Sequence, residues 1–110
     1  GELNGDALET SMDVEFTVDL IAGRSAPGPR VESATHIKAV GLDGSLDDAF
    51  RAATANMARW LETDYKLTPS EVAQVLGTAA EYKVSEAADR NAGIVLKIAK
   101  DRLAPLAPAR

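Results

Sequence analysis

The sequence predicts an α+β fold in which an antiparallel, barrel-like β-sheet portion is followed by two packed helices. Residues 12–21 alternate apolar and polar side chains, which is typical of a strand, whereas residues 45–63 and 68–79 carry apolar side chains at helical spacing. The 110 residues, 45% of them apolar and 26% charged, fit a single globular unit.

The first predicted element is a half-buried strand over residues 12–21. Its apolar row faces one side, and a polar row of acidic residues and Thr17 faces the other. The apolar row consists of Met12, Val14, Phe16, Val18 and Leu20. The acidic residues Asp13, Glu15 and Asp19 either meet solvent or cover a partner surface. Residues 3–9 could form a preceding strand that turns near residues 4–6.

A second strand is expected over residues 31–40, antiparallel to the first. The intervening residues 22–30 hold two glycines and two prolines and therefore predict a turn. Residues 41–44 contain two further glycines and turn the chain again. The segment 1–44 is accordingly expected to be mainly β.

Residues 45–81 are expected to be mainly helical, with two helices that begin at capping residues. Ser45 with Asp48 resembles a capping box, and apolar residues then recur at helical spacing to about residue 63. In the second helix Thr68 is the expected N-cap, Pro69 takes the first helical position and Glu71 completes the capping box.

The last third of the chain is less uniform. Residues 82–100 are expected to be mixed, with a short strand over 82–88 and an apolar run over 93–99 that periodicity alone assigns to neither strand nor helix. Residues 101–110 form a tail, and its part from Leu103 to Arg110, which is rich in alanine and proline, is expected to fray or to lie along a neighbour.

Composition excludes several classes of function. The formal charge of −5 argues against nucleic acid as the main partner, because phosphate binding requires clustered lysine and arginine. The chain has no cysteine, so disulfides, thiol nucleophiles and cysteine-based zinc sites are excluded. No apolar run reaches the roughly 18–20 residues of a membrane span, and no signal peptide opens the chain, so we expect a cytoplasmic protein.

Few residues are candidates for chemistry. His36 is the only histidine, which excludes a two-histidine metal site within this chain, and its position on a predicted strand favours a surface or core-edge role. Asp47 and Asp48 suit the positive end of a helix. Glu2 and Glu9 differ, because carboxylates beside a turn can bind a divalent metal or act as a general base.

The order of these motifs resembles the acetamidase/formamidase family. In that family a segment His-Ala-x-x-Gly-Asp-Gly-Glu-x-x-Gly-x-Ala-x-Glu runs into a β-strand, and this chain matches its end at Gly1, Glu2, Gly5, Ala7 and Glu9. Residues 41–49, 67–71 and 79–84 resemble later helix starts and a strand of the family, so the likeness extends to about residue 100.

The resemblance implies that this is the C-terminal part of an amidohydrolase. Such an enzyme cleaves small amides (formamide, acetamide or a cyclic amide such as a γ-lactam) to a carboxylate and ammonia or an amine. A divalent ion, for which zinc is the first candidate, would polarise the amide carbonyl of the substrate. It would also lower the pKa of the water molecule bound to the ion. The resemblance makes Glu2 a metal ligand or general base, with Glu9 as an outer metal-site residue.

The family's histidine and the aspartate before Gly1 have no counterpart in this sequence, so most metal ligands would lie on another chain. We therefore expect a two-chain enzyme, cleaved near Gly1, whose N-terminal chain stays associated with this one, and the enzyme is expected to be a homo-oligomer. Two alternatives remain open: a non-catalytic protein-binding module and an oligomerisation module, in which Glu2 is only a terminal residue.

Overall fold

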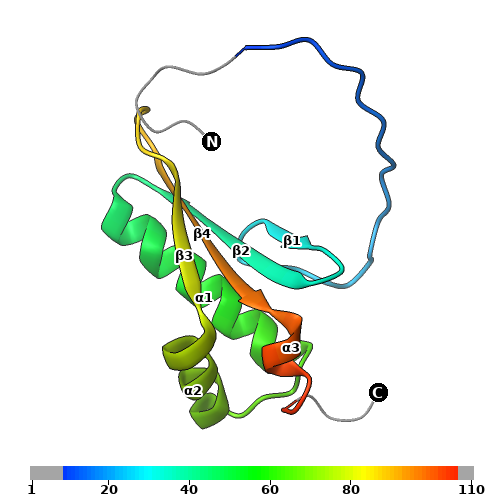
Figure 1. The fold of residues 1–110 in the computed structure, drawn as a ribbon, viewed down its shortest axis with the longest axis vertical. Helices are drawn as coiled ribbons and strands as arrows, with labels where there is room; N and C mark the ends of the chain where they lie inside the picture. Colours follow the sequence, from blue (N-terminus) through cyan, green and yellow to red (C-terminus); the bar gives the residue numbers. More distant parts are fainter. Residues whose placement is uncertain (1–8, 107–110) are drawn as a thin grey trace.

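The computed structural model describes residues 9–106, which contain one four-stranded antiparallel sheet and three helices (Figure 1). The elements in chain order are β1 (Arg30–Glu32), β2 (His36–Asp43), α1 (Leu46–Thr63), α2 (Pro69–Ala79), β3 (Glu81–Glu86), β4 (Ala92–Ala99) and α3 (Lys100–Leu103). The strand order is β1-β2-β4-β3. The α+β class is confirmed, but the barrel-like form is wrong: this sheet is open, with β1 and β3 as its edges.

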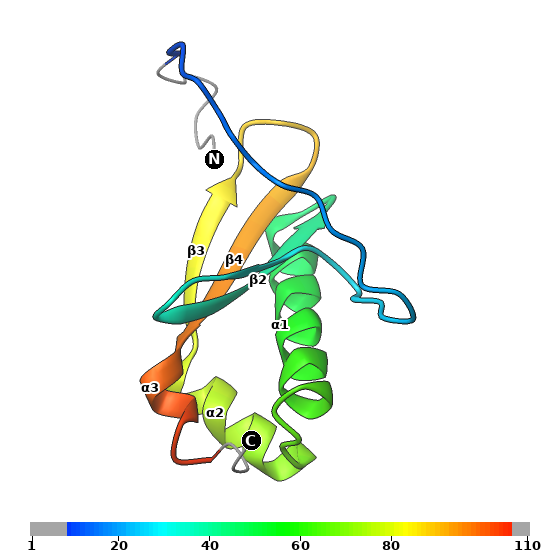
Figure 2. The ribbon, with the colours of Figure 1, turned by 90° about the vertical axis from the view of Figure 1, so that its right-hand side faces the viewer.

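Helix α1 covers one face of the sheet, and Figure 2 shows it lying along the two central strands. Alternate residues of β2 and β4 point toward the helix and are buried, because side chains along a strand alternate between faces. The most completely buried large side chains of this core are Ile37, Met57, Leu61, Leu96, Ile98 and Leu103. The shorter helices α2 and α3 lie together at one end of the sheet (Figure 1).

The closest approach of helix to sheet occurs at Gly41 of β2. A Cβ atom at this position would overlap the carbonyl oxygen of Ala49 and the backbone of Ala53, both in α1. The helix can lie this close because the strand contributes no side chain there and the helix contributes only methyl groups. The spacing between α1 and β2 is thus set by three small residues.

Both predicted helix starts are confirmed. Ser45 caps α1, and its hydroxyl accepts a hydrogen bond of 3.1 Å from the backbone N–H of Asp48. In α2 the N–H of Glu71 donates to Thr68 Oγ1 at 3.3 Å, while the N–H of Thr68 donates to Glu71 Oε2 at 2.8 Å. These bonds satisfy N–H groups that have no partner within the helix, which explains why the chain turns helical at these residues.

The predicted single strand over residues 31–40 is wrong, because this stretch forms a β-hairpin. The turn lies between β1 and β2, where the N–H of Ser33 donates to the carbonyl of His36 at 2.9 Å and the N–H of His36 donates to Ser33 Oγ at 3.1 Å. The serine hydroxyl supplies a local partner that competes with a straight strand. Strand β2 also continues through Gly41 to Asp43, so the chain turns later than expected.

The predicted strand over residues 12–21 is also wrong for this structure: these residues are extended but belong to no sheet among residues 9–106 (Figure 1). A strand needs a neighbour to pair with, and within residues 9–106 none lies beside them. Of the segment 1–44, the described strands therefore occupy only residues 30–43, and the first predicted antiparallel pair is not formed. The possible strand over residues 3–9 lies outside the described residues except for Glu9, which is not in a strand.

In the last third, the strand expected over residues 82–88 appears as β3, and the ambiguous run over 93–99 is β4. Strand β4 is central, pairing with β2 on one side and β3 on the other, which explains its nearly continuous apolar sequence. Of the tail expected from residue 101, the first part does not fray, because Leu103 packs against its neighbours. There α3 buries Leu103, and the N–H of Lys100 donates to the carbonyl of Thr35 at 2.8 Å. Residues 107–110 lie outside the described residues.

We expect Gly41→Ala to destabilise the fold by at least about 2 kcal/mol, because the new methyl group would meet the backbone of α1, which cannot move aside without separating helix and sheet. Urea unfolding of both proteins measures the difference. Gly77→Ala is the matched control. A Cβ there meets nothing within 4 Å, and the change should stabilise α2 by about 0.5–1 kcal/mol. Equal stability of the two variants would contradict the packing described at Gly41.

Candidate functional site around Arg30 and Trp60

Of the two carboxylates that the sequence singled out, the described residues include only Glu9. Glu2 lies outside the described residues. Glu9 is exposed at the start of the described chain. Within residues 9–106 no group of three histidine, cysteine or acidic side chains could hold a metal ion.

His36 has a structural setting consistent with a core-edge residue. It is half-buried at the start of β2, and its Nδ1 shares a hydrogen bond of 2.8 Å with Thr35 Oγ1. Asp47 and Asp48 are exposed in the first turn of α1, where negative charge stabilises the helix, as expected.

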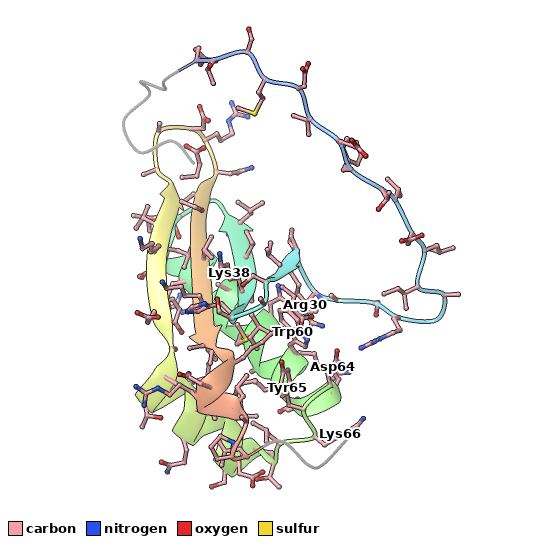
Figure 3. All side chains as sticks on the ribbon, turned by 45° about the vertical axis from the view of Figure 1, so that its right-hand side comes forward. Arg30, Lys38, Trp60, Asp64, Tyr65 and Lys66 are labelled. Carbon is pink, nitrogen blue, oxygen red and sulfur yellow. The ribbon has the colours of Figure 1, made fainter. Side chains whose placement is uncertain are left out.

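The most developed polar cluster instead lies where β1 meets α1, and it centres on Arg30 (Figure 3). The guanidinium carbon of Arg30 lies 5.0 Å from the ring centre of Trp60, a cation–π arrangement. Its Nε donates to Asn56 Oδ1 at 2.9 Å, and its Nη2 donates to the carbonyl oxygen of Asn56 at 3.2 Å. Burial is the main cause that lowers the pKa of Arg30 from its ordinary value.

Asn56 is the buried polar residue that connects this cluster to the sheet. Its Nδ2 donates to the carbonyl oxygens of Pro29, at 3.0 Å, and Val40, at 3.3 Å, while its Oδ1 accepts from Arg30. The side chain is 1% exposed. The side-chain amide of Asn56 therefore holds three groups at one turn of α1. They are the backbone just before β1, the backbone in the middle of β2 and the guanidinium of Arg30.

Asp64, at the C-terminal end of α1, forms the opposite side of the cluster. Arg24 Nη2 donates to Asp64 Oδ1 at 2.7 Å, and Thr63 Oγ1 donates to the same oxygen at 2.9 Å. Burial by itself raises the pKa of Asp64, but these hydrogen bonds and the charges of Arg24 and Arg30 together lower it below its usual value. The carboxylate is thus held ionised.

An open cavity of about 530 Å³ lies between these groups and the turn over residues 22–26. Its charged lining residues are Arg24, Arg30, Glu32 and Asp64. Arg24 is paired with Asp64, and Glu32 forms an ion pair of 2.7 Å with Lys100, so the lining is close to charge balance. The carboxylates of the lining, Glu32 and Asp64, are each engaged by a cation, and the cluster acts as an anchor between the N-terminal segment and α1.

Sequence reasoning missed this cluster. Trp60 falls within the apolar helix stripe expected over residues 45–63, and Arg30 is the last residue of the turn expected over residues 22–30. A signal was available in Asn56, a polar residue between the apolar positions 53 and 57 of the helix. A buried asparagine needs several partners, which predicts nearby backbone and cationic groups.

Comparisons with known proteins give a structural likeness. No family model matches the sequence. Among curated proteins, none matches either. The acetamidase of Yersinia enterocolitica matches with a TM-score of 0.64 and 23% identity, over 67% of this chain. A predicted acetamidase/formamidase of Thermoanaerobacter tengcongensis matches with a TM-score of 0.69 and 20% identity over 78% of this chain. The acetamidase of Bacillus halodurans matches with a TM-score of 0.67 and 26% identity over 76%.

The resemblance to acetamidase/formamidase structures that the motifs indicate is therefore confirmed at the level of fold, over most of this chain. The match covers 22% of the Yersinia chain, 29% of the Thermoanaerobacter chain and 28% of the Bacillus chain. This chain thus corresponds to a little over a quarter or less of each solved structure. Among the described residues, no helix is both long and apolar enough to cross a membrane.

We expect Asn56→Leu to lower the free energy of unfolding by about 2–4 kcal/mol, because it removes the buried amide that donates to the carbonyls of Pro29 and Val40 and leaves the Nε of Arg30 without its acceptor. Urea unfolding measures this loss. Asn91→Leu, at an exposed site between β3 and β4, should change the stability by less than about 0.5 kcal/mol. A small effect at both positions would contradict the role given to Asn56.

The Arg24–Asp64 pair predicts a pH-dependent stability. Because Arg24 is 58% exposed and solvent screens the pair, Asp64→Asn should cost no more than about 1 kcal/mol at pH 7. The pKa of Asp64 is lowered in the folded state, so its contribution is complete above the ordinary value of 3.8 and is lost as the pH falls through the lowered pKa. Unfolding curves of both proteins across this acidic range test it. A difference that persists at the acid end would argue against the ion pair as its source.

Proposed function

We propose that this chain is the C-terminal part of a cytoplasmic, metal-assisted amidohydrolase. The enzyme would cleave the C–N bond of small amides, namely formamide, acetamide or a cyclic amide such as a γ-lactam, to a carboxylate and ammonia or an amine. The observation that carries the proposal is the fold match to three acetamidase or formamidase structures. The order of the sequence motifs from Gly1 to about residue 100 adds support of a different kind, since fold alone does not determine function.

The catalytic centre would be shared with an N-terminal chain of the same enzyme. The described residues do not fit a divalent ion by themselves, because they include no cluster of suitable ligands. Glu2 is our candidate for a metal ligand or general base, and Glu9 for an outer residue of the metal site. The remaining ligands of the ion, for which we propose zinc, would come from the N-terminal chain, and the assembled enzyme would be a homo-oligomer.

A non-catalytic protein-binding or oligomerisation module is the second candidate. The observation that favours it is the exposed apolar row of residues 12–21, which needs a partner whether or not the assembly is an enzyme. Native mass spectrometry of the purified protein, followed by denaturation, distinguishes the two. The amidohydrolase predicts a second, larger polypeptide and a divalent metal in the native mass, whereas a simple module predicts this chain alone or multiples of it without metal.

We expect Glu2→Gln in the complete enzyme to lower kcat/KM for formamide or acetamide at least about 100-fold, because the amide cannot act as a base and binds metal poorly. Glu9→Gln should lower metal affinity or activity about tenfold or more. The control Asp89→Asn, at an exposed turn position, should leave activity unchanged. Assays on formamide, acetamide and a bicyclic lactam measure these effects. Hydrolysis that survives Glu2→Gln undiminished would remove Glu2 from the catalytic centre.

A further inference from the structure

The N-terminal segment, residues 9–29, carries a row of large apolar side chains in solvent. The side chains of Met12, Val14, Phe16, Val18 and Leu20 are between 70% and 91% exposed. They alternate with the polar residues Asp13, Glu15, Thr17 and Asp19, so an extended backbone presents one apolar and one acidic side. Burial of such a row is strongly favourable, and its exposure in a finished protein would promote aggregation.

The rest of the described chain does not cover this apolar row. The core between α1 and the sheet is closed by its own residues, and within the described chain no hydrogen bond joins residues 9–21 to residues 30–106. The root of the segment is nevertheless fixed, because Arg24 pairs with Asp64 and the carbonyl of Pro29 accepts from Asn56. Residues 12–21 therefore extend from a defined place on the folded unit (Figure 3).

We infer that residues 12–21 add a β-strand to an open sheet edge of the polypeptide that completes the amidohydrolase, an inference that rests on the proposed function. The backbone would pair with that edge, and the row from Met12 to Leu20 would pack on the apolar layer beneath it. The acidic row would face outward. The partner is thus defined chemically: an unpaired strand at least about ten residues long above an apolar surface.

The edges of this chain's own sheet are poorly suited as the partner. Strand β1 has three residues and β3 has six, so neither can pair with all ten residues of the segment, whether in the same chain or in a second copy. Pairing of two copies of the segment would bring acidic rows together on one face, where like charges repel. The matched acetamidase and formamidase structures, in contrast, are roughly three times as long as this chain, which leaves ample fold to supply the edge.

Amide hydrogen exchange tests the pairing directly. In the isolated chain, peptides that cover residues 12–21 should exchange at the rate of an unstructured peptide, whereas those from β4 should be protected. In the native assembly with the larger polypeptide, exchange of residues 12–21 should slow at least about 100-fold. Unprotected exchange in an active, intact enzyme would overturn the inference while leaving the proposed function intact.

Two substitutions at neighbouring positions test the apolar row and the acidic row separately. Phe16→Asp places a charge in the apolar row and should weaken binding of the larger polypeptide at least about 30-fold. Thr17→Asp places the same charge in the outward row and should change the affinity less than about threefold. Both variants should keep the far-ultraviolet circular dichroism of the parent, because neither side chain is buried in the folded unit. Equal loss or equal retention of binding would overturn the orientation proposed for the strand.

Two outcomes concern the identity of the partner. Protection that appears with increasing concentration of this chain alone would show that a second copy occupies the strand, and this would overturn the inference. A larger polypeptide that protects residues 12–21 and distinguishes Phe16→Asp from Thr17→Asp, but whose assembly hydrolyses none of the amides, would contradict the proposed function and support the docking mode.

Discussion

The contact between Gly41 of β2 and the small residues Ala49 and Ala53 of α1 is the constraint on which the rest of this structure depends. It brings the helix backbone against the strand and thereby determines which helix residues reach the sheet. One turn further along, Asn56 meets the carbonyls of Pro29 and Val40 because the helix lies this close. The position of the N-terminal segment follows from the same contact.

The polar cluster around Arg30 serves this attachment. The guanidinium of Arg30 lies over the ring of Trp60 and donates to Asn56. Arg24 pairs with Asp64 at the end of the same helix. These groups hold the root of the segment on α1. Under the proposed function, the chemistry that this chain contributes would come from Glu2 and Glu9 and not from this cluster.

Interpretation by local pattern succeeded where the interactions are local. The capping bonds of Ser45 and Thr68 join residues three positions apart, so the sequence contains both partners of each bond. The candidate site, in contrast, depends on contacts between residues that are far apart in the sequence. The contact between Arg30 and Asn56 spans 26 residues, and no periodicity links them. Glu2 and Glu9 were identified by their place beside a turn and by resemblance; Glu2 lies outside the described residues, and Glu9 belongs to no metal-binding cluster among them.

The sequence by itself determined the two helices with their starting residues, the apolar face of each, and the two-sided character of residues 12–21, because these properties depend on neighbours within a few residues along the chain. Only the tertiary structure decided that residues 31–40 form a hairpin and that residues 92–99 are the central strand β4. It also showed that residues 12–21 pair with no strand among the described residues. The physical reason is that a strand is completed by hydrogen bonds to another strand, and the identity of that strand is a property of the whole assembly.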